Sequence, residues 1–455
     1  MQCEQVDDVV IVVPGITGSL LADKDDTEVW GLSGTALLRG ITTFGRSVRK
    51  LALPDDIGDD HPGDGVTATG LIQDLHILPG IGAAVDGYQN LFAWLQREFT
   101  LTPAKGEVPG NLVAFPYDWR LSVRYNAREL KRTAQLALER WRAHHPRNQE
   151  ARVVFLCHSM GGLIARYSIN NLPDPVPTRS LITLGTPFQG SFDALTNLVN
   201  DKKVLGFDLS GVARSLPSLH QLAPDYRCIL QDGARVAAHT TDLPGVNRNL
   251  LRDAVRLHEE LRTDNTLYTH HAVVGQRQPT MVTGGLDGEK LTASVEIDGD
   301  VPHGDGTVAR FAARPAGSQA AEIGHVDKHG SLQNRQSVRD QIWTCLTAKD
   351  KDYRGVGRNN LGVDAPDVLA PSEPFTLEAC AEDDDLRVAA TVTPVDANED
   401  DAAPRPLRNL GGGRYGATYN NLAPGAYRVR THLRSDRRSA VTHLLLVTDT
   451  KDTDV

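Results

Sequence analysis

Residues 151–167 read ARVVFLCHSMGGLIARY and place Ser159 between an apolar run and a run with helical spacing. Strand, tight turn, serine, tight turn and helix is the arrangement that lifts a nucleophilic serine above a sheet. A serine hydroxyl attacks a carbonyl only when a base removes its proton, so this pattern indicates acyl transfer. Small residues two positions before and after the serine, here Cys157 and Gly161, let strand and helix pack closely. The alternative is a structural serine at a strand end.

A nucleophilic serine needs an acid and then a base, in this order along the chain. Asp305 lies in HGDGTVAR, on a Gly-flanked turn that can orient an imidazole, and Asp298 and Asp300 compete with it. For these aspartates, the alternative role is hydrogen bonding in turns. The candidate bases are His325 and His329, which could also be surface histidines. We favour His329 because Gly-Ser-Leu and then a final helical run, VRDQIWTCL, follow it, and the base is expected on the loop before that helix.

Two backbone amides are candidates for stabilising the oxyanion that forms during acyl transfer. The amide of Met160 lies at the expected N-terminus of a helix, where backbone N–H groups lack partners. The second donor is expected in VPGITGSLL, the loop after the first strand, where a Pro-Gly turn would direct the Ile16 amide toward the serine. The alternative is a simple Gly-rich turn.

The elements that must position these residues alternate between strands and helices. Apolar β-branched runs predict buried strands, and residues 130–141 and 162–172 have helical spacing. Such alternation is typical of a mostly parallel sheet with helices on both faces. Between about 190 and 265 the pattern becomes irregular and predicts an inserted cap. The expected strands are 9–13, 111–115, 152–156, 180–184, 270–274 and, with less support, 307–311.

Past residue 350 the pattern changes to short segments that alternate apolar and polar residues. Five such segments in about 85 residues predict an antiparallel β-sandwich of immunoglobulin type. A polar, Gly-rich stretch at 349–367 serves as the linker. We therefore expect a first domain at 1–350, with the cap at about 190–265, and a second at 366–455. In the second, Tyr427 follows a Pro-Gly turn and is expected to be a core or corner tyrosine.

Composition excludes several classes of function. The chain has 455 residues, 40% hydrophobic and 23% charged, with a net charge of −10 and no basic cluster, so nucleic acid is not an expected partner. Its five cysteines are scattered without metal-ligand spacing, and neither a metal nor another cofactor is expected. The apolar run at 9–13 is too short for a signal or transmembrane segment, and the sequence reads as cytoplasmic.

Eight motifs in order resemble the lecithin:cholesterol acyltransferase family, which includes lysosomal phospholipase A2 and the phospholipid:diacylglycerol acyltransferases. The resemblance runs from about residue 9 to about 346 and implies an α/β-hydrolase core. The motifs are VVPGITGSLL, GYQNLFAWLQREF, FPYDWR, CHSMGGLIARY, GTPFQGS, ARSLPSLHQLAP, GDGTV and HGSL.

The resemblance assigns a role to each candidate residue. It implies the nucleophile, acid, base and two oxyanion amides, which are Ser159, Asp305, His329, Ile16 and Met160. It also implies that Asp118, Trp119 and Arg120 of FPYDWR lie near the acyl-binding cleft as pocket residues. For these three, a buried Asp–Arg pair is the alternative. Secreted family members have a signal peptide and an early disulfide, whereas residues 17–75 contain no cysteine.

The expected function is hydrolysis of lipid acyl esters, with glycerophospholipids as acyl donor, through an acyl-enzyme on Ser159. One alternative is transfer of the acyl group to an alcohol, and another is a catalytically silent scaffold. Contact with membranes is expected to be transient. The C-terminal domain is expected to recruit a protein partner or to sit against the cap, and to contribute no catalytic residue. A chain ending near Lys351 should then hydrolyse a short ester at close to the full rate.

Overall fold

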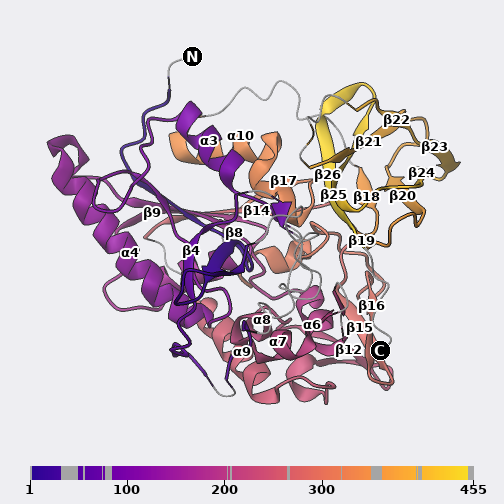
Figure 1. The fold of residues 1–455 in the computed structure, drawn as a ribbon, viewed down its shortest axis with the longest axis horizontal. Coiled ribbons are helices and arrows are strands. Elements are labelled where there is room, and N and C mark those ends of the chain that lie inside the picture. The colour runs from indigo at the N-terminus through magenta and orange to yellow at the C-terminus, as the bar shows by residue number, and fades with distance from the viewer. Residues whose placement is uncertain are drawn as a thin grey trace.

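The structure is a computed structural model. It describes residues 3–31, 50–54, 57–73, 75–76, 85–201, 203–204, 207–263, 267–318, 320–349, 361–395, 397 and 402–448. Figure 1 shows a central sheet with helices, a cap of helices and strands below it, and a separate group of strands beside it.

The central sheet has six strands, and every neighbouring pair is parallel, which confirms the predicted parallel sheet. All five residues of β1 are buried, as expected for a strand covered on both faces. In sheet order the strands are β17 (Ala321–His325), β14 (Thr269–Gly275), β9 (Thr178–Leu184), β8 (Val153–His158), β1 (Val9–Val13) and β7 (Leu112–Ala114).

Helices cover both faces of this sheet, and alternate residues of β1 belong to two different cores. Val9, Ile11 and Val13 pack with α4 and α5, whereas Val10 and Val12 pack with α3 and α10. Figure 1 shows α3 and α10 together above the sheet. The helices are α3 (Gln89–Glu98), α4 (Val123–His144), α5 (Met160–Asn170) and α10 (Gln336–Thr347).

One predicted strand is wrong, and one strand was not predicted. Residues 307–311 form a turn that leads into a 3-10 helix, Arg310–Ala313, because the Thr307 and Val308 amides bind the carboxylate of Asp305 instead of a neighbouring strand. The sixth strand is β17. It lies at the sheet edge, most of its residues are at least partly exposed, and its sequence AEIGH lacks an apolar run.

The cap lies between β9 and β14, but a later segment joins it. Its sheet has the order β13-β12-β15-β16, so a hairpin that follows β14 extends the cap beyond the predicted 190–265. The cap elements are α6 (Phe192–Val199), β10 (Lys203–Val204), β11 (Phe207–Asp208), α7 (Ser210–Ser215), α8 (Pro217–Gln221), β12 (Arg227–Gln231), β13 (Ala234–Ala237), α9 (Arg248–Leu261), β15 (Thr283–Asp287) and β16 (Lys290–Ser294).

Short elements connect these layers. Near the N-terminus a three-stranded sheet and a two-stranded ribbon follow β1, and single 3-10 turns occur later. They are β2 (Ser19–Ala22), β3 (Glu28–Trp30), β4 (Thr67–Leu71), β5 (Leu75–His76), β6 (Val85–Asp86) and the 3-10 helices Pro146–Asn148, Ala238–Thr240 and His329–Asn334.

The C-terminal part consists of two sheets around their own apolar core. All five predicted strands are present (β20, β21, β24, β25 and β26), and the pairing is antiparallel except between β19 and β26. Residues 350–360 of the predicted linker lie outside the described residues. One sheet contains β18 (Gly362–Asp364), β20 (Phe375–Cys380), β24 (Arg414–Tyr419) and β23 (Arg408–Gly411), and the other contains β19 (Val368–Leu369), β26 (Asp436–Val447), β25 (Gly425–Leu433), β21 (Val388–Pro394) and β22 (Arg405–Pro406).

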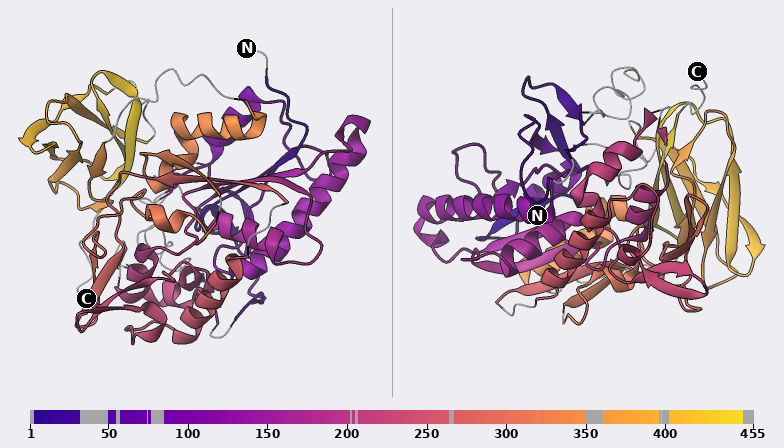
Figure 2. Two further views of the ribbon diagram at one scale, coloured as in Figure 1. Left: turned by 180° about the vertical axis from the view of Figure 1, so that it is seen from behind. Right: turned by 90° about the horizontal axis from the view of Figure 1, so that it is seen from below.

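These two sheets, the C-terminal sandwich, pack directly on the first part of the chain (Figure 2). The Gln278 side chain donates to the Leu361 carbonyl at 3.1 Å and accepts from the Val363 amide at 3.0 Å. Arg428 of β25 pairs with the buried carboxylate of Asp86 at 2.7 Å. The sandwich is therefore fixed to the core by buried polar contacts as well as by apolar packing.

Candidate active site

Ser159 lies on the sharp turn between β8 and α5, with φ 51° and ψ −127°. Left-handed backbone at a residue other than glycine is strained and is held by the surrounding packing. Two glycines make the turn sterically feasible. A Cβ on Gly161 would approach the Pro14 carbonyl oxygen to 2.5 Å, and one on Gly162 would approach the Thr186 hydroxyl to 2.1 Å. Cys157, in the position where glycine is usual, is fully buried.

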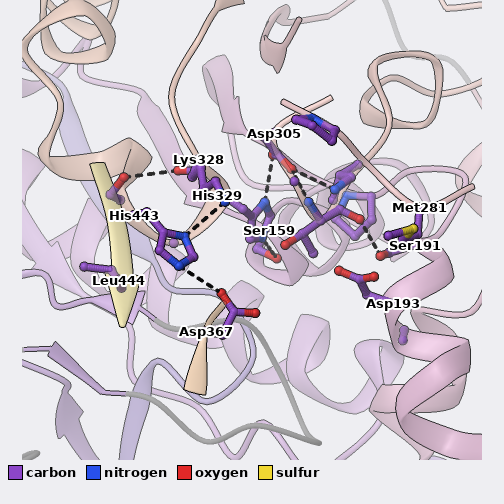
Figure 3. A pocket seen from close by; sticks show the side chains of 18 of the residues that line it. Ser159, Ser191, Asp193, Met281, Asp305, Lys328, His329, Asp367, His443 and Leu444 are labelled. Carbon is purple, nitrogen blue, oxygen red and sulfur yellow. Dashed lines mark hydrogen bonds and ion pairs between the residues drawn. The ribbon is translucent and has the colours of Figure 1, made fainter. Parts of the chain in front are cut away.

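Ser159, His329 and Asp305 form one hydrogen-bonded row, seen near the centre of Figure 3. His329 Nε2 lies 2.9 Å from Ser159 Oγ, and His329 Nδ1 lies 2.8 Å from Asp305 Oδ2. All three residues are buried. Because the carboxylate can only accept, Nδ1 carries a proton and Nε2 is left as the acceptor for the serine hydroxyl. This is the geometry of a serine with its general base.

Asp305 is held as an ion by its surroundings. Burial by itself would raise the pKa of this carboxyl, but the charge and hydrogen bond of His329 and the Val308 amide outweigh it, and the pKa is lowered. Its Oδ1 accepts from the amides of Thr307 at 3.0 Å and Val308 at 2.7 Å. Gly185, with φ 59°, leaves the space that the carboxylate needs, because a Cβ there would lie 2.5 Å from Oδ2.

The competing candidates have other hydrogen-bond partners. His325 ends β17, and its Nδ1 accepts from the Asp327 amide at 3.1 Å; burial lowers its pKa to about 4. Asp298 pairs with Arg235, and Asp300 makes backbone hydrogen bonds with Ile297 in a turn. Of the histidines and aspartates considered, the structure brings His329 and Asp305 to the serine.

A second hydrogen-bonded row, which sequence reasoning missed, lies behind the triad. The Gly15 amide donates to the Tyr88 hydroxyl at 2.9 Å, and this hydroxyl lies 2.9 Å from His158 Nδ1. His158 Nε2 lies 3.0 Å from the His329 carbonyl oxygen, which can only accept. His158 therefore donates through Nε2 and accepts from Tyr88 through Nδ1. Burial lowers the pKa of His158 to about 3, so the ring stays neutral near neutral pH.

This row links the loop after β1 to the backbone of the residue that bears the basic imidazole. The sequence contained one signal for it, a histidine directly before the serine. Its partner Tyr88 is 70 positions away along the chain and could not be paired with it from spacing alone.

The two predicted oxyanion donors flank the serine. Met160 is the first residue of α5, and Ile16 follows Gly15, whose added Cβ would lie 2.9 Å from the Cβ of Ser159. Among the described residues, neither amide donates a hydrogen bond to another group. Both N–H groups are therefore available to an oxygen bound at the serine.

The three predicted pocket residues of FPYDWR, Asp118, Trp119 and Arg120, do not line the cavity into which Ser159 opens. Arg120 is fully buried and binds the Asp118 carboxylate through Nε at 3.0 Å and Nη2 at 2.7 Å, with Asp64 as a second partner at 2.7 Å. Trp119 is also fully buried, and its indole donates to the Ser19 carbonyl. None of the three is among the described residues that line the cavity at Ser159. The structure thus places Asp118 and Arg120 in a buried ion pair and Trp119 beside them in the chain, with none of the three on the wall of this cavity.

Ser159 opens into a cavity of about 600 Å³. Its floor is made by the triad and Ile16, and one wall comes from the cap and is largely apolar, including Leu219, Leu222 and Met281. The other wall comes from the C-terminal sandwich, through residues 364, 365, 367 and 442–444. The C-terminal sandwich therefore lines the same cavity as the serine, and its role as a separate module stays a prediction.

One comparison with known proteins, that with protein families, agrees with the resemblance. The family described as Lecithin:cholesterol acyltransferase matches residues 83–232, which confirms the resemblance over the segment that contains FPYDWR and the serine turn. No curated protein matches. No helix in the described part of the chain has the length and apolar character needed to span a bilayer.

Among solved structures, the chain is similar to the Bacillus licheniformis lipase BlEst2 in its propeptide form, with 12% identity over 96% of this chain and 74% of that one, at a TM-score of 0.36. It is also similar to a superoxide reductase from Ignicoccus hospitalis (9% identity, 20% and 79% covered, TM-score 0.14). The soluble domain of PmoD from Methylocystis gives 12% identity with 21% and 95% covered, at a TM-score of 0.17. These scores are too low to assign a fold.

Proposed function

We propose that this relative of the lecithin:cholesterol acyltransferase family is a serine-dependent hydrolase of lipid acyl esters. One observation carries the proposal. The Ser159 hydroxyl, hydrogen-bonded to a histidine that an ionised aspartate orients, opens into a cavity with an apolar cap wall. An activated nucleophile beside an apolar cavity suits a carboxylic ester with an acyl chain.

In the acylation step, Ser159 Oγ attacks the ester carbonyl carbon while His329 Nε2 takes the hydroxyl proton. The carbonyl oxygen becomes an oxyanion, which the amides of Ile16 and Met160 stabilise. When the tetrahedral intermediate collapses, the bond to the alcohol oxygen breaks and His329 gives its proton to that oxygen. Asp305 stays ionised throughout and stabilises the imidazolium.

In the second step a water molecule replaces the alcohol. His329 takes a proton from the water as its oxygen attacks the acyl-enzyme, and then returns the proton to Ser159 Oγ as the fatty acid leaves. Water is the proposed acceptor, and glycerophospholipids are the proposed donors. Passing the acyl group to an alcohol is the alternative within this class.

A fluorophosphonate probe tests the nucleophile. We expect the wild-type chain to be labelled at Ser159 and the Ser159→Ala variant to remain unlabelled. A folded wild type without label would contradict the enzyme proposal and leave the scaffold alternative. Equal labelling of Ser159→Ala would show that another residue is the nucleophile.

Product analysis separates water from an alcohol as acceptor. The chain is incubated with a diacyl phospholipid and a long-chain alcohol, with Ser159→Ala as the blank, and the lipids are measured by mass spectrometry. Free fatty acid should exceed the alcohol ester. The reverse would replace the hydrolase by an acyltransferase.

We also propose that the C-terminal sandwich is of immunoglobulin type. Tyr427, at the start of β25, donates its hydroxyl to the Ala423 carbonyl at 2.8 Å, which resembles the corner tyrosine of such domains. Location in the cytoplasm and a protein partner for the sandwich remain predictions from the sequence.

A further inference from the structure

The sandwich wall of the cavity is mostly polar, whereas the cap wall is mostly apolar but includes Asp193 and Asn197. It presents His443 and its neighbours on β26, together with Asp364 and Asp367 from the segment around β18 and β19. Facing them is Lys328, which directly precedes the triad histidine and lines the same cavity (Figure 3). Lys328 therefore lies one residue from the reacting centre and against the sandwich.

The ammonium group of Lys328 has one acceptor in the described part of the chain. Its Nζ lies 3.0 Å from His443 Nδ1, and His443 Nε2 donates to the Pro366 carbonyl at 2.9 Å. His443 is 2% exposed, and burial together with the Lys328 charge lowers its pKa to about 3. The imidazole is thus neutral, so it accepts a hydrogen bond from the lysine but does not neutralise its charge.

Carboxylates surround the lysine at a greater distance. The pKa of Lys328 is lowered, because the effect of burial is larger than that of the Asp367, Asp364 and Asp193 charges, which favour the ammonium form. Asp364 and Asp367 are exposed at the mouth, where solvent weakens their field. Among the described residues, Lys328 forms no ion pair. A half-buried cation without a direct counter-ion is costly unless a ligand supplies one.

We propose that Lys328, held by His443 of the sandwich, is a specificity-determining residue that binds an anionic oxygen of the ester substrate beside the triad. The acyl chain then lies along the apolar cap wall, and the charged part lies against the sandwich. The aspartates at the mouth repel a doubly charged group. The subsite therefore suits a singly charged one, such as a phosphodiester or a carboxylate.

The role of Lys328 rests on the proposed function in one respect, namely that the cavity binds an ester. Anion binding is therefore measured first, in a chain that cannot turn over substrate. Calorimetry on the Ser159→Ala chain compares diethyl phosphate with uncharged triethyl phosphate, and butyrate with uncharged butyramide. At least one anion should bind about tenfold to a hundredfold more tightly than its uncharged match, as for a hydrogen bond to a charged group. The anion that binds identifies a phosphodiester or a carboxylate as the source.

Substitutions then locate the cation. Adding Lys328→Met should abolish the preference for the anion, Lys328→Arg should retain it, and the exposed-lysine control Lys290→Met on β16 should not change it. Asp367→Asn should strengthen anion binding about twofold to fivefold, because it removes an exposed opposing charge. This variant keeps the test decisive if Lys328→Met does not fold.

Kinetics on the wild-type serine give an independent readout. We compare kcat/KM for mono-p-nitrophenyl glutarate and p-nitrophenyl butyrate, and for a short-chain diacyl glycerophosphocholine and the matching diacylglycerol. In each pair Lys328→Met should lower the ratio of charged to uncharged substrate. An equal fall for both members would make Lys328 a positioning residue for His329 and overturn the proposal. The proposal would also be overturned if neither anion binds more tightly than its uncharged match. Absence of hydrolysis with all esters would refute the proposed function alone, since binding is measured separately.

Discussion

Removal of a single hydroxyl group, in Tyr88→Phe, should impair catalysis without weakening substrate binding. This hydroxyl serves two partners, the Gly15 amide and His158 Nδ1, each at 2.9 Å, and Tyr88 is almost fully buried. An unsatisfied buried polar group costs about 1–3 kcal/mol. We therefore expect the free energy of unfolding to fall by about 2–4 kcal/mol after partial relaxation.

Tyr88→Phe also removes the hydrogen bond that holds the loop bearing the Ile16 amide. It removes the partner of His158 as well, and His158 binds the backbone of His329. Misplacement of a catalytic group by about 1 Å can cost on the order of a hundredfold in rate. We expect kcat for p-nitrophenyl butyrate to fall about tenfold to a hundredfold. KM should change little, because Tyr88 is not among the described residues that line the cavity.

Tyr117→Phe is the matched control. Its hydroxyl is also buried and donates to the same loop, at the Pro14 carbonyl, but it has this single partner at 2.9 Å. Its loss leaves one buried group unsatisfied instead of two, so it should cost about 1–3 kcal/mol and change kcat less than threefold. Urea unfolding and steady-state kinetics on both variants give the comparison. Equal losses of kcat, or a Tyr88→Phe effect confined to stability, would refute the role of the second row.

Four further outcomes are expected. His329→Ala should lower kcat about 10³-fold or more, whereas His325→Ala should keep most of the activity in the same ester assay; the reverse pattern would reassign the base. Arg120→Met should lower the free energy of unfolding by about 3–5 kcal/mol in urea titrations, because it leaves the Asp118 carboxylate buried without its partner; a change below about 1 kcal/mol would contradict this. A chain ending at Lys351, if circular dichroism shows it folded, should hydrolyse short esters at least tenfold more slowly than the full chain, since it lacks one cavity wall; an undiminished rate would contradict this and support the prediction that the second domain is a separate module. Acid should destabilise the protein, because burial lowers the pKa of five histidines below their unfolded value of about 6.5, namely His158, His220, His270, His325 and His443. The unfolded chain therefore binds protons first, and the free energy of unfolding falls by about 1.4 kcal/mol per pH unit for each histidine as the pH drops from about 6.5 toward 4. Urea midpoints at pH 7, 6 and 5 should show this fall, and the fall should be smaller in His270→Phe.

Local signals in the sequence were sufficient for the elements around the serine. The β-branched run of β1 and the strand–serine–helix pattern each predict their element from neighbouring residues. The order serine, acid, base narrowed the partners to a few residues, and the structure brings together Ser159, Asp305 and His329.

What could not be predicted depends on contacts between distant segments. Strand β17 has an amphipathic edge sequence with no apolar run, and Thr307 and Val308 give their amides to a carboxylate instead of a sheet. The sequence of FPYDWR allowed two roles, lining a pocket or forming a buried ion pair. It could not decide between them, because Asp64, the second carboxylate that binds Arg120, lies 56 positions earlier. A change of composition after residue 350 correctly indicated a sandwich but carried no information about the surface on which it packs.

The position of β26 has a consequence for synthesis on the ribosome. Residues 442–444 line the cavity at Ser159, yet of the described elements their strand is translated last. The triad residues emerge earlier, as does the entire cap. Between the synthesis of His329 and that of β26, the serine therefore faces a cavity that lacks one side, and the complete cavity forms only after the sandwich has folded onto the rest of the chain. Folding of β26 thus sets the moment at which the cavity at Ser159 becomes complete in a nascent chain.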